Sequence, residues 1–210
     1  RRAARRWHLA RRVLQVAALV LLPFVLLVRV AVTAYAAWGY PTWLALMVAT
    51  AAAAGVVTLY AAWLSKRLTG RARFAAMAKI VGLPLVLGYT LYALLYVSAA
   101  NAKSDAVRAE YLRLHPILRL GVGTLIVADG DVIITDMARR LDDYAAMGLP
   151  AFERSRHLRQ PDGYAHALDL RTIGRGEIRN RLTQLYFAVM GFATLRHVGT
   201  ADHLHVELPR

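Results

Sequence analysis

The sequence predicts three N-terminal transmembrane α-helices followed by a small α+β domain with an antiparallel sheet. Two observations carry this prediction. Residues 1–100 contain three long apolar runs and no Asp or Glu, whereas the remaining 110 residues contain all thirteen acidic residues. The second part also alternates strand-like and helical patterns over a length that suits one small core. We therefore assign residues 1–100 to a membrane domain and residues 103–210 to a folded domain beside it.

Each apolar run is long enough to cross a bilayer, which takes about 20 mostly apolar residues. We expect the spans at about 13–38, 43–64 and 80–98. The alternative, buried helices of a soluble protein, would need a core larger than 210 residues can enclose. The lipid bilayer is thus the first expected partner. Nucleic acid is not expected, because the positive charge flanks the apolar runs instead of covering a soluble face.

Basic residues predict the orientation of the spans. Six arginines precede the first span. The loop that follows the second span adds Lys66, Arg67, Arg71 and Arg73. The positive-inside rule places both segments in the cytoplasm. Three crossings then put the N-terminus in the cytoplasm and the C-terminal domain on the periplasmic or extracellular side of a cell membrane.

The C-terminal domain is expected to contain short helices and strands. In chain order the elements are a helix at 104–115, a hairpin around 129–130, a helix at 138–147, a strand at 165–171, a helix ending at 191, and a hairpin of 192–198 with 203–208. Apolar residues recur at helical spacing before residue 191 and predict a stripe that faces the core: Ile178, Leu182, Leu185 and Val189.

The residues suited to chemistry lie between 155 and 208. His203 and His205 are separated by one residue, so on a strand they project from the same face. His157 and Asp169 precede them. Histidine and aspartate are ordinary zinc ligands, and three protein ligands with one open position are typical of catalytic zinc sites. The alternative is a set of unrelated polar side chains. The chain has no cysteine, which excludes thiolate ligands and a cysteine nucleophile.

The order of motifs in this segment resembles the D-alanyl-D-alanine carboxypeptidase and endopeptidase group of zinc peptidases, which shares its fold with the hedgehog signalling domain. The motifs are Ser-x-His at 155–157, Gly-x-Ala at 163–165, Ala-x-Asp-Leu at 167–170 and His-x-His at 203–205. The resemblance covers about the last hundred residues and implies a zinc-peptidase-like domain. It implies a Zn²⁺ ion held by three residues: His157, Asp169 and His205.

The first ligand spacing departs from the family. There the histidine usually lies seven residues before the aspartate, whereas His157 lies twelve residues before Asp169, so residues 158–162 would have to loop out. His166 is therefore a rival ligand. On a strand, however, it would point away from the face that carries Asp169. We rank His157 first.

The resemblance also implies roles for residues around the metal. Asp202 takes the place of the family's general base three residues before the last ligand, although a turn aspartate is the alternative. His203 matches the histidine that steadies a developing oxyanion. Arg139 matches the arginine that binds the substrate carboxylate, but the residues just before it depart from the family pattern. Glu207 shares the face of His205 and is expected to orient a ligand histidine.

Together these features predict a zinc metallopeptidase in a bacterial inner membrane, with metal-activated water hydrolysing peptidoglycan stem peptides at D-Ala-D-Ala or at a cross-link. One alternative is a non-catalytic module of the same fold that binds cell-wall peptide or a partner protein, as hedgehog does. Another is an accessory subunit of a membrane complex. The long spacing before Asp169 and the altered segment before Arg139 favour the non-catalytic module.

Overall fold

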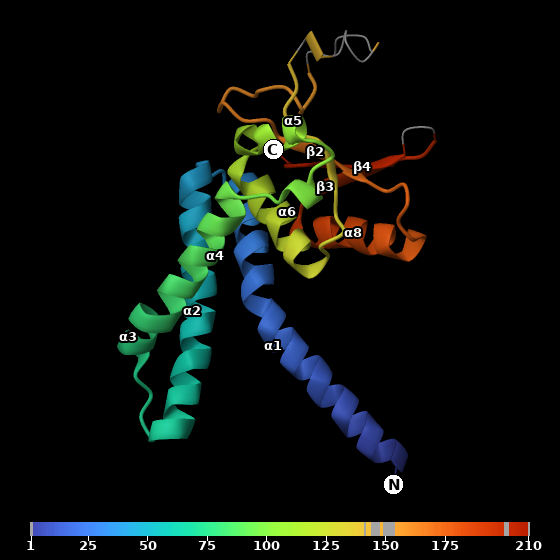
Figure 1. The fold of residues 1–210 in the computed structure, drawn as a ribbon. Helices are drawn as coiled ribbons and strands as arrows, with labels where there is room; N and C mark the ends of the chain where they lie inside the picture. Colours follow the sequence, from blue (N-terminus) through green and yellow to red (C-terminus); the bar gives the residue numbers. More distant parts are fainter. Residues whose placement is uncertain (1, 141, 144–147, 149–153, 200–201, 210) are drawn as a thin grey trace.

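The computed structural model describes residues 2–140, 142–143, 148, 154–199 and 202–209. Long helices extend from one side of a small α+β domain (Figure 1). They are α1 (Arg2–Ala36), α2 (Thr42–Thr69) and a third helix built from α3 (Phe74–Met77), η1 (Ala78–Gly82) and α4 (Leu83–Leu95). All three are long and apolar enough to cross a membrane, which indicates a membrane protein, as predicted.

The C-terminal domain contains a four-stranded antiparallel sheet in the order β1-β2-β4-β3. Its elements are η2 (Ala99–Asn101), α5 (Asp105–Ala109), η3 (Tyr111–Arg113), α6 (Pro116–Ala128), β1 (Ile134–Asp136), β2 (Ala167–Arg171), α8 (Glu177–Met190), β3 (Ala193–His197) and β4 (His203–Glu207). The α+β class, the antiparallel sheet and the final hairpin are confirmed. The predicted helix from residue 104 is split into α5 and η3.

The hairpin predicted around residues 129–130 is wrong, because the residues before it form helix α6. Pro116 occupies the first turn, and the His115 side chain caps the helix by accepting a hydrogen bond from the Ile117 backbone N–H. Leu118 and Leu120 are fully buried, and α6 packs against α1 and α4. This burial favours a helix over the turn that Asp129-Gly130 suggests.

The helix predicted at 138–147 is not formed at its start. Residues 138–140 are not helical, and Arg139 forms an isolated bridge with Leu158. Residues 142–143 are helical, and residues 141 and 144–147 lie outside the described part of the chain. The bridge brings Arg139 beside the segment that contains His157, which matters for the site.

The apolar stripe on α8 does not face the core, contrary to the prediction. Ile178, Leu182, Leu185 and Val189 are 76%, 59%, 57% and 55% exposed. A different face of the helix is buried, with Asn180, Thr183, Phe187 and Met190. Phe187 makes edge-on contacts with the rings of Tyr186 and Phe192. The predicted helical period is therefore correct, but the stripe lies on the uncovered side.

One continuous core joins the long helices to the C-terminal domain, running from Leu27 in α1 to Leu208 after β4. Polar bonds strengthen the junction. The Arg119 guanidinium donates to the Leu94 carbonyl oxygen, and the Tyr111 hydroxyl donates to that of Ala93. We therefore expect the C-terminal domain to need residues 1–100 for its folding, since their removal would expose α6.

Candidate metal site

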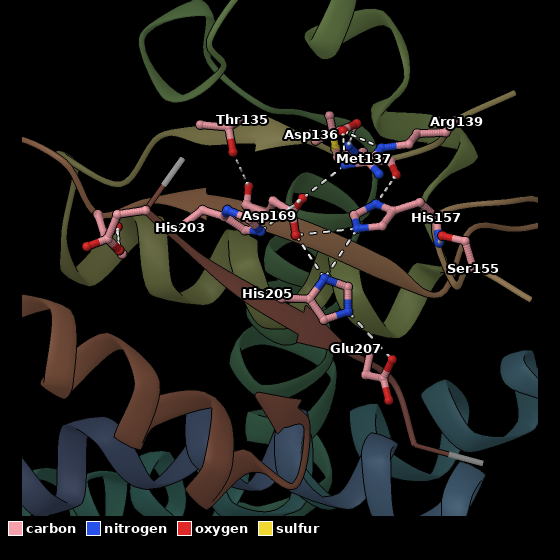
Figure 2. Close-up of polar contacts among 12 residues, drawn as sticks. Thr135, Asp136, Met137, Arg139, Ser155, His157, Asp169, His203, His205 and Glu207 are labelled. Atoms are coloured by element: carbon pink, nitrogen blue, oxygen red, sulfur yellow. Dashed lines mark hydrogen bonds and ion pairs between the residues drawn. The ribbon is translucent and has the colours of Figure 1, made fainter. Parts of the chain in front are cut away.

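Two histidines and an aspartate meet on one face of the sheet (Figure 2). Asp169 in β2 lies directly across from His205 in β4. His157 comes from the segment before β2, and its carbonyl oxygen accepts a hydrogen bond of 2.8 Å from the Arg139 N–H. Three separate segments of the C-terminal domain thus bring these side chains together. The predicted ligand set is therefore grouped in space.

The three side chains converge at distances that suit a metal ion. His205 Nδ1 lies 2.9 Å from Asp169 Oδ1, and His157 Nε2 lies 3.3 Å from both atoms. In a tetrahedral zinc site with bonds of about 2.0–2.1 Å, two ligand atoms lie roughly 3.3 Å apart. The three atoms are thus spaced as three corners of such a site.

Hydrogen bonds set the proton positions on the histidines. His157 Nδ1 lies 2.7 Å from the Met137 carbonyl oxygen, which can only accept, so Nδ1 carries a proton and Nε2 is the nitrogen left for a metal. His205 Nε2 lies 3.5 Å from Glu207 Oε2, which favours a proton on that nitrogen. Metal-binding histidines are commonly oriented by a carbonyl or carboxylate on the far nitrogen. The residues present therefore fit a zinc ion.

Asp169 is kept ionised by its surroundings. Burial raises the pKa of Asp169, but hydrogen bonds with His157 and His205 and the charges of His157 and His203 outweigh burial and hold this pKa well below its usual range. Its second oxygen, Oδ2, lies 3.3 Å from Arg139 Nη2, and the same guanidinium bonds to Asp136. Asp169 is thus a carboxylate at neutral pH, as a metal ligand must be.

The site opens on the side of β4. The side chains of His157 and Asp169 are 5% and 6% exposed, whereas those of His203 and Glu207 are 28% and 34% exposed. His203 Nε2 lies 3.8 Å from Asp169 Oδ2, beside the three converging atoms and not among them. The open side of the ligand set therefore faces solvent near His203.

The structure does not bring Asp202 to the site. Its carboxylate accepts hydrogen bonds of 2.9 Å and 3.0 Å from Arg196 and one from the Thr172 hydroxyl. These bonds lower the pKa of Asp202 to about 2. Alternation along β4 puts position 202 on the face of Leu204, opposite His205. We therefore interpret Asp202 as a residue that ties the final hairpin together, in place of the general base expected from the sequence.

A cleft of about 700 Å³ lies next to the site. The cleft is lined in part by Asp136, Met137 and Arg139. Met137 contacts His157 and Arg139 contacts Asp169, while Asp136 binds the Arg139 guanidinium. Arg139, the predicted substrate anchor, thus stands between the cleft and Asp169. The part played by Met137 was not predictable from the sequence, because it acts through its backbone oxygen. Asp136 gave no signal beyond its position three residues before Arg139.

A second group of polar residues lies nearer the long helices: His115, Asp162 and His166. His166 Nε2 lies 2.7 Å from Asp162 Oδ2, so the rival ligand belongs to this group and does not lie beside Asp169. Burial lowers the pKa of His115 to about 3, which leaves its imidazole neutral at physiological pH.

The neutral His115 is held in one tautomer. Its Nδ1 accepts the Ile117 N–H, so the proton lies on Nε2, which is 2.9 Å from the Thr42 hydroxyl oxygen. A nitrogen that carries a proton cannot bind a metal at the same time. We therefore interpret this second group as a polar contact between the C-terminal domain and the first turn of α2.

A scan against protein-family models, a search of the curated proteins and a search of the solved structures each found no match to this chain. The expected likeness to the D,D-peptidases therefore rests on the sequence motifs alone.

Zinc affinity is expected to fall as the pH falls. Burial lowers the pKa of His205, but hydrogen bonds to Asp169 and Glu207 and their charge outweigh burial and raise this pKa above its usual range. In the metal-free chain the proton on Nδ1 must therefore leave before zinc binds, and it leaves only at higher pH. Zinc titrations of the detergent-solubilised full chain should show an apparent Kd about tenfold weaker for each pH unit below that pKa. A Kd that stays constant between about pH 5.5 and about pH 8 would contradict this interpretation.

Proposed function

We propose that this chain is a membrane-anchored zinc peptidase with its ion held by His157, Asp169 and His205. The observation that supports the proposal is the convergence of two ring nitrogens and a carboxylate oxygen within 2.9–3.3 Å of one another. A bound zinc ion polarises a carbonyl group and lowers the pKa of water to about 7, which is the chemistry that peptide hydrolysis needs.

The substrate class in this proposal is a peptidoglycan stem peptide, cut at D-Ala-D-Ala or at a cross-link. It comes from the resemblance of the motifs to the D,D-peptidases. The direction of the site agrees with such a substrate, because His205 lies on the face of the sheet opposite Leu204 and Val206, which are buried in the core shared with the long helices. With the basic loop between Lys66 and Arg73 in the cytoplasm, this face would look out toward the cell wall of a bacterium.

In this proposal His203 acts as a general acid or base and stabilises the oxyanion that develops during hydrolysis. It lies on the open side, 3.8 Å from Asp169 Oδ2, and histidine is the commonest general acid or base. Arg139 would take up a substrate carboxylate from the cleft, since a guanidinium binds carboxylates through paired hydrogen bonds. Asp136 and Asp169 already hold this guanidinium, so the substrate would have to join them.

A second candidate function is favoured by the position of Asp202. Its ion pair with Arg196 leaves the site without the carboxylate base that the resemblance implies. A zinc-retaining module that binds cell-wall peptide or a partner protein would need no such base. The same surface would also serve an accessory subunit of a membrane complex.

Hydrolysis assays separate the two functions. The zinc-loaded full chain should release D-Ala from a stem peptide ending in D-Ala-D-Ala or cut a cross-linked muropeptide, and a chelator should abolish the reaction. His203→Ala should keep the zinc and lower turnover by about 10²-fold or more, because positioned acid-base groups contribute about that much. Asp202→Asn should leave turnover nearly unchanged. Full zinc occupancy without turnover on either substrate would contradict the peptidase and support the binding module.

A further inference from the structure

A narrow apolar stripe runs along α8 and is left uncovered by the rest of the described chain. Its members follow one another at spacings of four, three and four residues: Ile178, Leu182, Leu185 and Val189. At about 100° per residue the centre of the stripe lies roughly 150° around the helix from the buried face. Each side chain is more than half exposed. A continuous exposed apolar surface of this kind marks a site of contact with another apolar phase.

The C-terminal end of α8 is held at the level of a membrane-spanning helix. Gly191, which follows α8, packs so closely on α1 that an added Cβ would overlap the Arg29 guanidinium and lie 3.1 Å from Val32 Cγ1. Both residues belong to the candidate span Arg11–Ala36. Arg29 lies seven residues before the end of that span, about 10 Å along the helix axis. The C-terminal end of α8 therefore lies beside α1 about 10 Å inside the end of the span at Ala36.

A second chain of contacts gives α8 a similar depth. The Tyr186 hydroxyl in α8 donates to the Gly121 carbonyl oxygen in α6 at 2.8 Å. In turn, Thr124 in α6 lies 2.8 Å, hydroxyl to hydroxyl, from Tyr89. Tyr89 belongs to the third candidate span, Phe74–Leu95, six residues before its end. A direct contact with the first span and an indirect one, through α6, with the third span thus place α8 beside the membrane-crossing part of the protein.

The direction of α8 suits a helix that lies in the plane of a membrane. Figure 1 shows α8 running crosswise to α2 and α4, on the side of the sheet from which the long helices extend. The stripe therefore points away from the sheet and toward the volume that lipid fills around the spans. Charged residues flank the stripe on both sides, where Arg179 pairs with Asp129 and Asp131 and Arg181 pairs with Glu177.

We propose that α8 is an interfacial helix whose stripe inserts into the membrane leaflet nearest the C-terminal domain, in contact with lipid acyl chains. Helices with one apolar face and a basic polar face bind in this way, with the apolar face about 5–10 Å into the boundary between headgroups and acyl chains. Arg29 adds a cation at the C-terminal end of α8, where the helix dipole is negative. The inserted helix would hold the sheet at a fixed height, with the metal-site face turned away from the bilayer. This proposal does not depend on the chemistry of the site.

Single-cysteine labelling tests the proposal directly, because the chain contains no cysteine of its own. Leu182→Cys and Leu185→Cys would each carry an environment-sensitive fluorophore in the full chain, reconstituted in phosphatidylcholine nanodiscs with one chain per disc. The matched control is Glu177→Cys, whose side chain is 55% exposed and lies about 110° around the same helix from the centre of the stripe. Quenching by a spin label on the lipid acyl chain and by aqueous iodide is then compared between the positions.

The two stripe positions should be quenched several-fold more by the lipid spin label than the control and several-fold less by iodide, with blue-shifted emission. Iodide quenching equal to that of the control would overturn the proposal, since the stripe would then face water. Protection from both quenchers would also overturn it, because protein and not lipid would cover the stripe. Using two stripe positions keeps the test valid if one labelled variant does not fold.

Discussion

Substituting His205 by alanine is expected to abolish zinc binding. His205 Nδ1 is one of the three converging atoms, so its removal leaves His157 and Asp169 as a pair of ligands. Loss of an outer partner of a ligand typically costs 10–100-fold in metal affinity, so loss of the ligand itself should exceed about 100-fold. Competition of the full chain with a chromophoric chelator measures this change.

His203→Ala is the matched control for His205→Ala. His203 lies on the same strand and the same face, two residues away, and is beside the converging atoms without belonging to them. Its loss should change the zinc affinity by less than about tenfold. Tenfold is the smallest loss typically seen when a residue that hydrogen-bonds to a metal ligand is removed. Equal losses of affinity in the two variants would show that the ion is held differently.

Phe187→Ala is expected to destabilise the protein by about 3–5 kcal/mol. The ring is fully buried and contacts Tyr186 and Phe192, so its removal leaves a cavity between α8 and the core. For a chain of about this length the melting temperature should fall by about 6–20 °C. Thermal unfolding of the detergent-solubilised full chain, followed by circular dichroism, measures the shift.

Leu185→Ala serves as the control for Phe187→Ala on the same helix. Leu185 is 57% exposed, so its truncation should change the unfolding free energy by no more than about 0.5 kcal/mol. A loss as large as that of Phe187→Ala would mean that the stripe is covered by protein, and it would count against an interfacial α8 as well.

The contrast between Phe187 and Leu185 shows how far a sequence pattern predicts burial. The spans were predictable because an uninterrupted run of about 20 apolar residues is typical of helices that cross a bilayer. The helical period of α8 was also visible, but its most apolar face was assigned to the core. The core instead uses Phe187 and Met190 beside Asn180 and Thr183. A hydrophobic period identifies a helix, whereas the choice between core and lipid depends on neighbours far away in the sequence.

Helix α6 shows a second limit. Its stabilisation comes from burial against α1 and α4, which are distant in the sequence. Locally, Pro116 suggested the end of an element and Asp129-Gly130 suggested a turn. Both features were compatible with a helix that starts at the proline and ends before the aspartate, and only tertiary packing selects it.

The candidate site was predictable where its residues follow strand alternation. Asp169 and His205 lie on one face of adjacent strands, as the two-residue period requires. His157 was assigned to the site from the Ser-x-His motif alone. No local pattern in the sequence predicts that this residue, which lies before β2, comes close to Asp169 and His205. The position of Asp202 was not predictable, because residue spacing does not show that Arg196 on the neighbouring strand donates hydrogen bonds to its carboxylate.

We expect His157, and not His166, to complete the metal site. Zinc content by plasma mass spectrometry, after equilibration with zinc and removal of the free ion, tests it on the full chain and two variants. The site proposed here requires about one zinc per chain in the unchanged protein and in His166→Ala, and almost none in His157→Ala. Zinc retained in His157→Ala and lost in His166→Ala would contradict this expectation and move the ion to the group around His115.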